Sequence, residues 1–286
     1  MKPIVIGIGE FLWDVLPDGK KAGGAPVNFA YHASQNGAEG WAVSAIGDDP
    51  LGHELRSVAS EHNISMLVPY VPHPTGTVQV ELKNGQPNFI ICEDVAWDYI
   101  PLTEDALDKA RHAAAVSFGT LAQRSPVSRA TTRALVEATP ADALMVYDIN
   151  LRQHFYSKEL IEDNLRMANV FKINDEELEK LQPMFGLAGV ETDDACRFFL
   201  KEFDLRMLVL TGGDTFSSIY TPDEISTIPT PKVKVVDTVG AGDSFSGALV
   251  GALLNGASIR EAHRVAVKTA AYVCTQSGAW TPPAKD

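Results

Sequence analysis

Cysteine is scarce in this chain. It has only three, at positions 92, 196 and 274, and none of them stands in a CxxC spacing. Three widely separated cysteines provide neither a disulfide framework nor a zinc site, and they indicate free thiols in a reducing compartment. The first residues, MKPIVIGIGEF, offer too short an apolar run for a signal peptide. We therefore expect a buried first strand and a cytoplasmic protein.

Long apolar runs and an excess of basic charge are also lacking. No run approaches the roughly 20 apolar residues that a membrane-spanning helix needs. Lysine and arginine number 24 against 37 aspartates and glutamates, a formal net charge of -13. Such a surface repels nucleic acid and anionic membranes, so we expect neither as a partner. An anionic ligand must then be held by helix N-termini, backbone amides or a metal.

Two common nucleotide-binding motifs and the usual histidine metal motifs are missing. No GxxxxGK[ST] is present, which excludes a P-loop, and GIGEFL at 7–12 departs from GxGxxG. A nucleotide-dependent oxidoreductase is therefore disfavoured. The seven histidines form no i, i+4 pair and no HExxH, and we assign none of them to a metal or to catalysis.

Short runs rich in β-branched residues alternate with helical segments along most of the chain. The expected strands are 4–9, 41–47, 114–119, 144–150, 170–174 and 207–213. The expected helices are 26–36, 51–61, 103–112, 126–138, 175–181 and 191–203, the third capped by Thr103. This alternation predicts an α/β protein with a mainly parallel sheet covered on both faces. Without repeats or linkers, we expect one domain over 1–286.

Residues 75–91 break this rhythm. They alternate apolar and polar residues and contain Asn84-Gly85, a hairpin signal. Alternation places Val78, Val80 and Leu82 on one face. We expect a lid formed by about 11–22 and 75–98, or an oligomer surface, although a surface hairpin without a role stays open.

The segment DTVGAGDSFSG (237–247) surrounds one acid with small residues. We expect a strand at 232–236, then a glycine loop and a helix that starts at Ala241 or Gly242 and ends near Gly256. Unpaired N–H groups in the first turn of such a helix bind anions. The acid itself, Asp243, is also explained by simple stabilisation of a helix N-terminus.

Three motifs together resemble one family. DTVGAGD resembles the C-terminal signature of the ribokinase-like (PfkB) carbohydrate kinases, and residues 23–52 resemble the N-terminal one. Asn174-Asp175-Glu176-Glu177 fits the family's N-x-x-E. The three occur in the family's order and cover essentially the whole chain. The resemblance implies a three-layer α/β/α fold with a small antiparallel β lid, and an ATP- and Mg²⁺-dependent sugar kinase.

The resemblance also implies roles in phosphoryl transfer. Asp243 would be the general base for the sugar hydroxyl. The amides of Gly240, Ala241 and Gly242 would stabilise charge on the transferring group.

Further residues would hold the nucleotide and cations. Asn174 and Glu177 would organise Mg²⁺, Glu177 through water, although the pair also fits a capping box. In LTGG, Thr211 and Gly213 would lie near ribose or phosphate. Asp237, with 274–281, resembles the monovalent-cation (K⁺) site of some members.

The sugar would be held near the N-terminus of the chain. The resemblance assigns this role to Asp14, Gly23, Gly24 and Asn28, although Asp14 beside a Pro-Asp-Gly turn also fits a turn residue. Arg152, in DINLR, would reach substrate or phosphate from a strand end.

The motif GEFLWDVLPDGKKAGGAPVNFAYH is most similar to fructokinases, and the few basic residues near it favour an uncharged acceptor. Ribose stays open as an acceptor, and Arg152 keeps 2-keto-3-deoxygluconate open. A non-catalytic sugar or nucleotide sensor is the alternative from another class. We also expect a homodimer formed through the lid.

Overall fold

A large sheet runs through the middle of the molecule. The computed structural model describes residues 1–16, 19–83 and 86–283. Within them the sheet has nine strands in the order β15-β14-β13-β12-β11-β10-β1-β4-β6. The strands are β1 (Ile4–Ile8), β4 (Glu39–Val43), β6 (Ser65–Leu67), β10 (Ala113–Gly119), β11 (Leu144–Asp148), β12 (Val170–Asn174), β13 (Met207–Gly212), β14 (Phe216–Tyr220) and β15 (Ile225–Pro229). Strand β14 pairs antiparallel with both β13 and β15, and all other neighbours pair in parallel.

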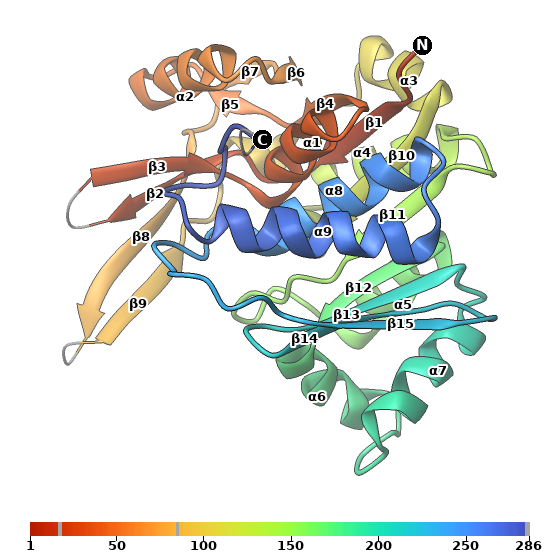
Figure 1. The fold of residues 1–286 in the computed structure, drawn as a ribbon. Coiled ribbons are helices and arrows are strands. Elements are labelled where there is room, and N and C mark those ends of the chain that lie inside the picture. The colour runs from red at the N-terminus through yellow and green to blue at the C-terminus, as the bar shows by residue number, and fades with distance from the viewer. Residues whose placement is uncertain (17–18, 84–85, 284–286) are drawn as a thin grey trace.

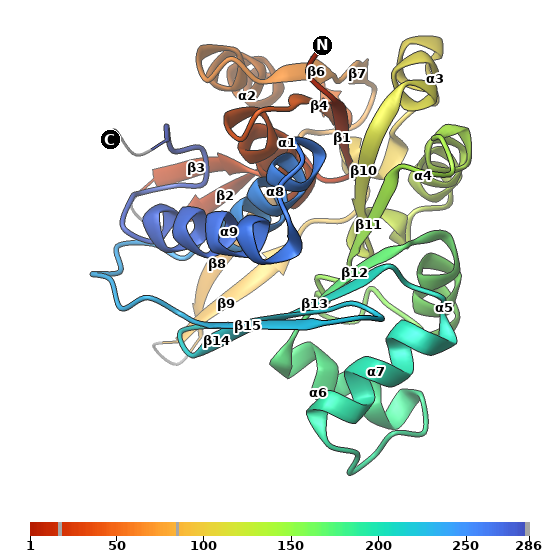
Figure 2. The ribbon, with the colours of Figure 1, turned by 45° about the vertical axis from the view of Figure 1, so that its right-hand side comes forward.

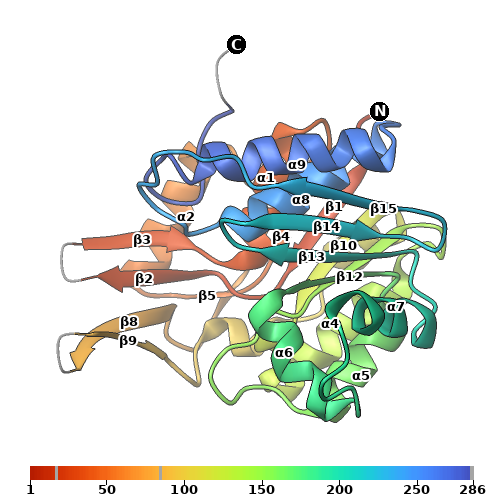
Figure 3. The ribbon, with the colours of Figure 1, turned by 60° about the horizontal axis from the view of Figure 1, so that its bottom comes forward.

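Helices cover both faces of this sheet (Figures 1, 2 and 3). One face carries α1 (Ala25–Gln35), α8 (Ala241–Leu254) and α9 (Ile259–Val273). The other carries α3 (Glu104–Arg111), α4 (Pro126–Ala138), α5 (Lys158–Met167), α6 (Asp175–Met184) and α7 (Thr192–Glu202). Side chains alternate between the faces: Val5 packs in the cluster of Phe29 and Phe245, whereas Ile6 and Ile8 join the opposite one. The predicted α/β architecture is confirmed.

Smaller elements complete the molecule. A two-stranded sheet of β5 (Ile46–Gly47) and β7 (Tyr70–Val71) contacts the 3₁₀ helix η1 (Ala96–Tyr99), and β5 also contacts α2 (Pro50–Glu61). A second 3₁₀ helix, η2 (Leu121–Arg124), follows β10. In the described residues, no helix combines the length and the apolarity that crossing a membrane would require.

Local sequence signals predicted most of these elements. Five of the expected strands and all six expected helices are present, and the Thr103 hydroxyl accepts the N–H of Ala106 at 3.2 Å as a cap. The expected strand 41–47 is divided between β4, which ends at Val43, and β5 in the two-stranded sheet. The expected strand at 232–236 is wrong: these residues form an irregular segment in which Val236 is 60% exposed. Pro229 and Pro231 lack the N–H groups that would extend the preceding strand. Strands β14 and β15 and helices α5 and α9 were not predicted.

A small sheet projects from one end of the molecule (Figure 3). Its order is β3-β2-β8-β9, from β2 (Leu12–Leu16), β3 (Gly19–Gly23), β8 (Gly76–Lys83) and β9 (Gln86–Ile91). Its two hairpins are antiparallel, as predicted for the second, while β2 and β8 pair in parallel where the hairpins join. Val78 is buried against the main core, whereas the Asn84-Gly85 turn and the side chains of Val80 and Leu82 lie outside the described residues.

Candidate active site

A cleft of about 740 Å³ separates the carboxyl ends of the parallel strands from the small sheet. Ligands of open α/β sheets bind at this edge. Ten of the predicted site residues line it: Asp14, Gly24, Asn28, Arg152, Asn174, Thr211, Gly213, Gly240, Gly242 and Asp243. Gly23, Glu177, Asp237 and Ala241 are not among the lining residues, and Ala241 lines an adjoining pocket.

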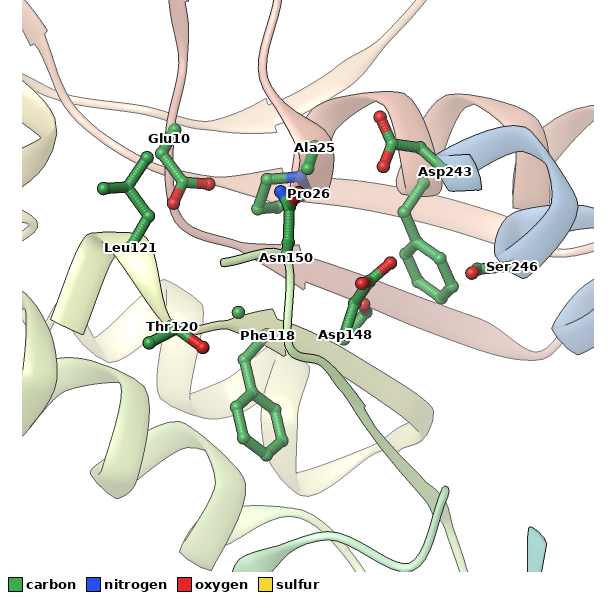
Figure 4. A pocket seen from close by; sticks show the side chains of 13 residues that line it. Glu10, Ala25, Pro26, Phe118, Thr120, Leu121, Asp148, Asn150, Asp243 and Ser246 are labelled. Carbon is green, nitrogen blue, oxygen red and sulfur yellow. The ribbon is translucent and has the colours of Figure 1, made fainter. Parts of the chain in front are cut away.

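Asp243 occupies the third position of α8 and faces the cleft (Figure 4). Its Oδ2 accepts a hydrogen bond from Asn28 Nδ2 at 2.8 Å. The indole Nε1 of Trp280 donates to Asn28 Oδ1, also at 2.8 Å. Because Asn28 and Trp280 are both buried, this chain of hydrogen bonds fixes the orientation of the carboxylate.

The charge environment of Asp243 suits a general base. Burial, followed by the charge of Asp148, raises its pKa from 3.8 to about 6. Asn28, Lys172 and Arg152 work in the opposite direction. The carboxylate is therefore ionised at neutral pH, yet close enough to its pKa to accept a proton readily.

The start of α8 forms an anion cradle. Gly240 caps the helix in the left-handed region (φ 76), with no side-chain cap. The N–H groups of Gly242 and Asp243 belong to the first helical turn, where no intrahelical carbonyl is available. The N–H of Ala241 differs from expectation, because it donates to the Thr238 carbonyl at 3.2 Å. The cradle thus rests on two amides rather than three.

Lys172 supplies a cation beside this cradle. Its ammonium group lies 3.3 Å from the place where a Cβ on Gly242 would stand, and it forms an ion pair with Asp148 Oδ2 at 2.8 Å. Burial works against the charge, but the Asp148 carboxylate raises the pKa of Lys172 above its usual value. An ammonium group beside free helix amides makes a strong site for phosphate.

Asn174 and Glu177 form the start of α6. Asn174 Oδ1 accepts the N–H of Glu177 at 2.8 Å, and Glu177 Oε2 accepts the N–H of Asn174 at 3.0 Å, a complete capping box. The second oxygen of Glu177 accepts the N–H of Leu151 at 2.8 Å. Burial, then the charge of Asp148, raises the pKa of Glu177. Both its oxygens are therefore engaged by backbone, and a metal role through water stays a prediction.

The residues that face the cleft at this end are Asn174, Asp175 and Glu176. Among the described residues, no group of three or more histidine, cysteine or acidic side chains could hold a metal ion. This donor set fits a hard cation that is bound mainly by phosphate oxygens and water, with the protein in contact through one or two groups.

Asp237 forms an ion pair with Lys21. Its Oδ2 accepts from Lys21 Nζ at 2.7 Å and from the N–H of Gly278 at 3.1 Å, and its Oδ1 accepts the N–H of Val239 at 3.0 Å. Burial raises the pKa of Asp237, but Lys21 and the two amides hold it below its usual value. The ion pair joins β3 to the loop before α8, and the monovalent-cation role of Asp237 stays a prediction.

The N-terminal motif frames the other end of the cleft. Burial raises the pKa of Asp14, on β2, to about 6, although Arg152 lowers it. A Cβ on Gly24 (φ 131) would stand 2.1 Å from the Glu10 carbonyl, so this position accepts only glycine. The same substitution at Gly23 would reach to 3.6 Å from Asp14 Oδ2. These glycines thus let α1 start close to the chain that carries Glu10 and Asp14.

An adjoining pocket of about 350 Å³ extends the cleft between α8, α9 and the irregular segment after β15. Thr211 and Gly213 line both spaces. Apolar side chains form most of the pocket wall, among them Val233, Val235 and Phe245. Its size and character fit a flat heterocycle whose polar substituents reach into the cleft.

Three site residues escaped sequence reasoning: Glu10, Lys172 and Trp280. Lys172 interrupts the apolar strand VFKIN, and Glu10 directly follows the first strand. Both are charged residues in buried stretches, and this was a readable signal. No sequence signal marked Trp280, because only the fold brings it into contact with Asn28.

Comparison with known proteins identifies the family. The model of the pfkB family carbohydrate kinases matches residues 18–286. A putative sugar kinase of Pyrococcus horikoshii, PH1459, is 28% identical over 99% of this chain and 94% of its own length. Its crystal structure superposes with a TM-score of 0.82, covering 97% of this chain and 93% of the other at 27% identity.

Fructokinases are among the other similar proteins. A probable fructokinase-4 of Arabidopsis thaliana is 29% identical over 97% of this chain and 93% of its own length. A fructokinase from Vibrio cholerae, solved with fructose, ADP and calcium, shares the fold at 23% identity and a TM-score of 0.82, covering 98% of this chain and 96% of the other. The chain has the ribokinase-like fold and belongs to the pfkB family of carbohydrate kinases.

Proposed function

We propose that this protein transfers the γ-phosphoryl group of ATP to a primary hydroxyl of fructose or a closely similar neutral sugar. The observation that carries the proposal is the position of Asp243: a cleft-facing carboxylate in the first turn of a helix that has no side-chain cap. A base and an anion cradle thus meet at one point. The fructose and ADP named for the Vibrio cholerae fructokinase, and the ATP named for a second PH1459 structure, support the choice of substrates.

The chemistry follows from this geometry. The sugar hydroxyl gives its proton to Asp243 while its oxygen forms a bond to the γ-phosphorus. The bond from that phosphorus to the β,γ-bridging oxygen breaks, and ADP leaves. The amides of Gly242 and Asp243 and the Lys172 ammonium stabilise the charge on the transferring group. Asn28 keeps the base aimed at the hydroxyl.

The nucleotide would lie across the other half of the site. Its base fits the apolar pocket beside Phe245, and its ribose and phosphates would pass Thr211 and Gly213 towards the cradle. Mg²⁺ bound to the phosphates would neutralise part of their charge. Asn174 and Glu176 face the place where the ion and its waters would sit.

The small sheet would act as a lid within a single kinase domain. Leu12, Val78 and Ile91 line the cleft from this sheet, so its closure over the sugar would exclude water that competes with the acceptor hydroxyl.

We also propose a homodimer in which the lid's edge strands β3 and β9 pair with another copy. Sedimentation that finds only monomers at micromolar concentration would remove the dimer.

A second acceptor class rests on one observation. The exposed Arg152 side chain lines the cleft, and a guanidinium group there would suit a sugar acid such as 2-keto-3-deoxygluconate. Ribose is a further acceptor to compare. The alternative of a non-catalytic sugar or nucleotide sensor predicts binding without turnover.

A cytoplasmic location stays a prediction from the three free cysteines.

The test is ATP consumption with a panel of acceptors. We expect fructose to give the highest kcat/KM among fructose, ribose, 2-keto-3-deoxygluconate and adenosine, with turnover by Asp243→Asn lowered roughly 10²–10⁴-fold. A higher kcat/KM for the sugar acid would replace the fructose proposal. Tight binding of sugar and ATP without phosphate transfer would favour the sensor.

A further inference from the structure

Glu10 is a buried acid that the proposed phosphoryl transfer leaves without a task. It follows β1, is 4% exposed, and lines the cleft close to Asp14 and Asp243. Its position is rigid, because its own carbonyl abuts Gly24 and the preceding Gly9 carbonyl accepts the Ser44 hydroxyl at 2.6 Å. These contacts hold the backbone at Glu10, and its side chain lines the cleft.

The carboxyl group has unused hydrogen-bonding capacity. Backbone N–H groups of Glu10 and Ala122 donate to it, whereas a carboxylate has about four acceptor positions. Among the described residues, no lysine or arginine forms an ion pair with it. An acid that is buried and without an ion-pair partner is costly to a fold, and this one lies in the wall of a ligand cleft.

The space in front of Glu10 has the size of a hydroxyl group. Behind the cleft lies a small pocket of about 10 Å³, room for roughly one water molecule. Glu10, Asn150 and Asp243 line it, and the carboxyl groups of Glu10 and Asp243 project towards it from opposite sides (Figure 4). A sugar ring cannot enter a pocket of this volume, but one of its hydroxyl groups can.

We propose that Glu10 is a specificity-determining residue of the acceptor site, whose carboxyl group receives a hydrogen bond from a second hydroxyl of a neutral sugar and repels acidic sugars. The inference rests on the proposed kinase function and names its acceptor class. Glu10, Asp14, Asp148 and Asp243 all line the cleft, and of these Asp148 is paired with Lys172. An acceptor carboxylate placed there would meet this negative charge despite Arg152.

The charge of the base also acts on Glu10. Burial raises the pKa of Glu10 to about 7, and the charge of Asp243 contributes to this rise. The other charged groups that line the cleft are Asp14, Asp148, Arg152, Lys172, Asp175 and Glu176. Asp243 has the lower pKa, so it ionises first and its charge opposes the ionisation of Glu10. Because Glu10 is mostly protonated where Asp243 titrates, Glu10→Gln should leave the acidic limb of kcat/KM in place. A KM for fructose that rises while the KM for MgATP does not is therefore the readout that a purely structural role would not give.

The test is Glu10→Gln, which keeps the shape and removes the charge. We expect the KM for fructose to rise by about 10- to 100-fold, the KM for MgATP to stay within about twofold, and the ratio of kcat/KM for 2-keto-3-deoxygluconate to that for fructose to increase. Glu137→Gln, on the exposed face of α4, is the matched control. Glu10→Asp, which withdraws the carboxylate by one methylene, should also raise the KM for fructose, and it replaces Glu10→Gln if that variant does not fold.

The outcomes distinguish a failure of the role of Glu10 from a failure of the proposed kinase function. If the unmodified enzyme phosphorylates no neutral sugar, the proposed function fails first. If it phosphorylates fructose and neither Glu10 variant changes the KM for fructose, the role of Glu10 is overturned while the function stands. A parallel rise of both KM values with a lowered melting temperature would assign Glu10 to structure alone and also overturn the proposal.

Discussion

Helices α6 and α8 both begin at the cleft and both carry an acid at the third position of the first turn, Glu177 and Asp243. In α6 the acid turns back and bonds the N–H of Asn174, so the helix caps itself. In α8 the capping position is Gly240, which has no side chain to accept from the first turn. Asn28, from α1, binds the acid instead and turns it towards the cleft.

The difference shows how one local pattern serves two purposes. Any acid in a first turn is stabilised by the helix dipole, so the pattern alone does not distinguish a cap from a base. The distinction comes from the capping residue and from a partner that is distant in sequence. A glycine cap leaves amides for a ligand, and an amide from another helix orients the acid.

The largest expected effect comes from neutralising the acid of α8. Asp243→Asn should lower kcat by roughly 10²–10⁴-fold, because the hydroxyl loses its base, with the KM for MgATP nearly unchanged. Asp194→Asn, at the same position of α7 and exposed, is the matched control. Steady-state kinetics of both variants check this, and near-normal turnover by Asp243→Asn would remove its assignment as the base.

The next effect concerns the cation beside the cradle. Lys172→Met should lower kcat by about 10²-fold, the size expected for one lost charge-stabilising donor. In the unmodified enzyme, kcat/KM should fall as the pH drops through about 6, where Asp243 takes up a proton. Because Lys172 lowers the pKa of Asp243, the variant's acidic limb should lie at higher pH.

The control for this variant removes both partners. Lys172→Met alone leaves Asp148 buried without its ion pair, so Asp148→Asn with Lys172→Met separates catalysis from stability. Retained low kcat in the stable double variant would support the cradle. An acidic limb that does not move in the single variant would contradict the electrostatic link to Asp243.

A smaller effect is expected from filling the glycine cap of α8. Gly240→Ala would force a left-handed backbone on alanine, at about 1–2 kcal/mol, and would place its Cβ 2.6 Å from the Ala279 Cβ. Gly256→Ala shares the left-handed backbone (φ 88) but meets nothing within 4 Å. Thermal unfolding and kinetics should show both variants destabilised and only Gly240→Ala strongly impaired in kcat. Equal kcat values would show that the cradle tolerates the displacement.

The smallest effect concerns the self-capped helix. Asn174→Ala should reduce the free energy of unfolding by about 1 kcal/mol, the usual value of a lost cap, and should raise the Mg²⁺ concentration for half-maximal activity. Denaturant unfolding and Mg²⁺ titration measure the two effects separately. Lost stability with an unchanged Mg²⁺ requirement would leave Asn174 as a cap alone.

Local patterns predicted the alternating strands and helices, the second lid hairpin and the start of α8 at Ala241, because each depends on neighbours along the chain. They failed at 232–236, where alternating valines resembled a strand but prolines and exposure prevent pairing. They also missed the β14-β15 hairpin and the Lys172–Asp148 ion pair. An edge strand or a buried ion pair depends on which segments come to lie side by side.

The sequence by itself determined the α/β architecture, because periodicity is a local property. The resemblance of its motifs to those of carbohydrate kinases pointed to Asp243 as the candidate base. Only the tertiary structure decided that Asp243 faces the cleft while Glu177 closes its own helix. It also decided that Lys21 pairs with Asp237 and that Glu10 lines the cleft. The physical reason is that burial and charge pairing, which set the orientation and pKa of an acid, arise from residues distant in the chain.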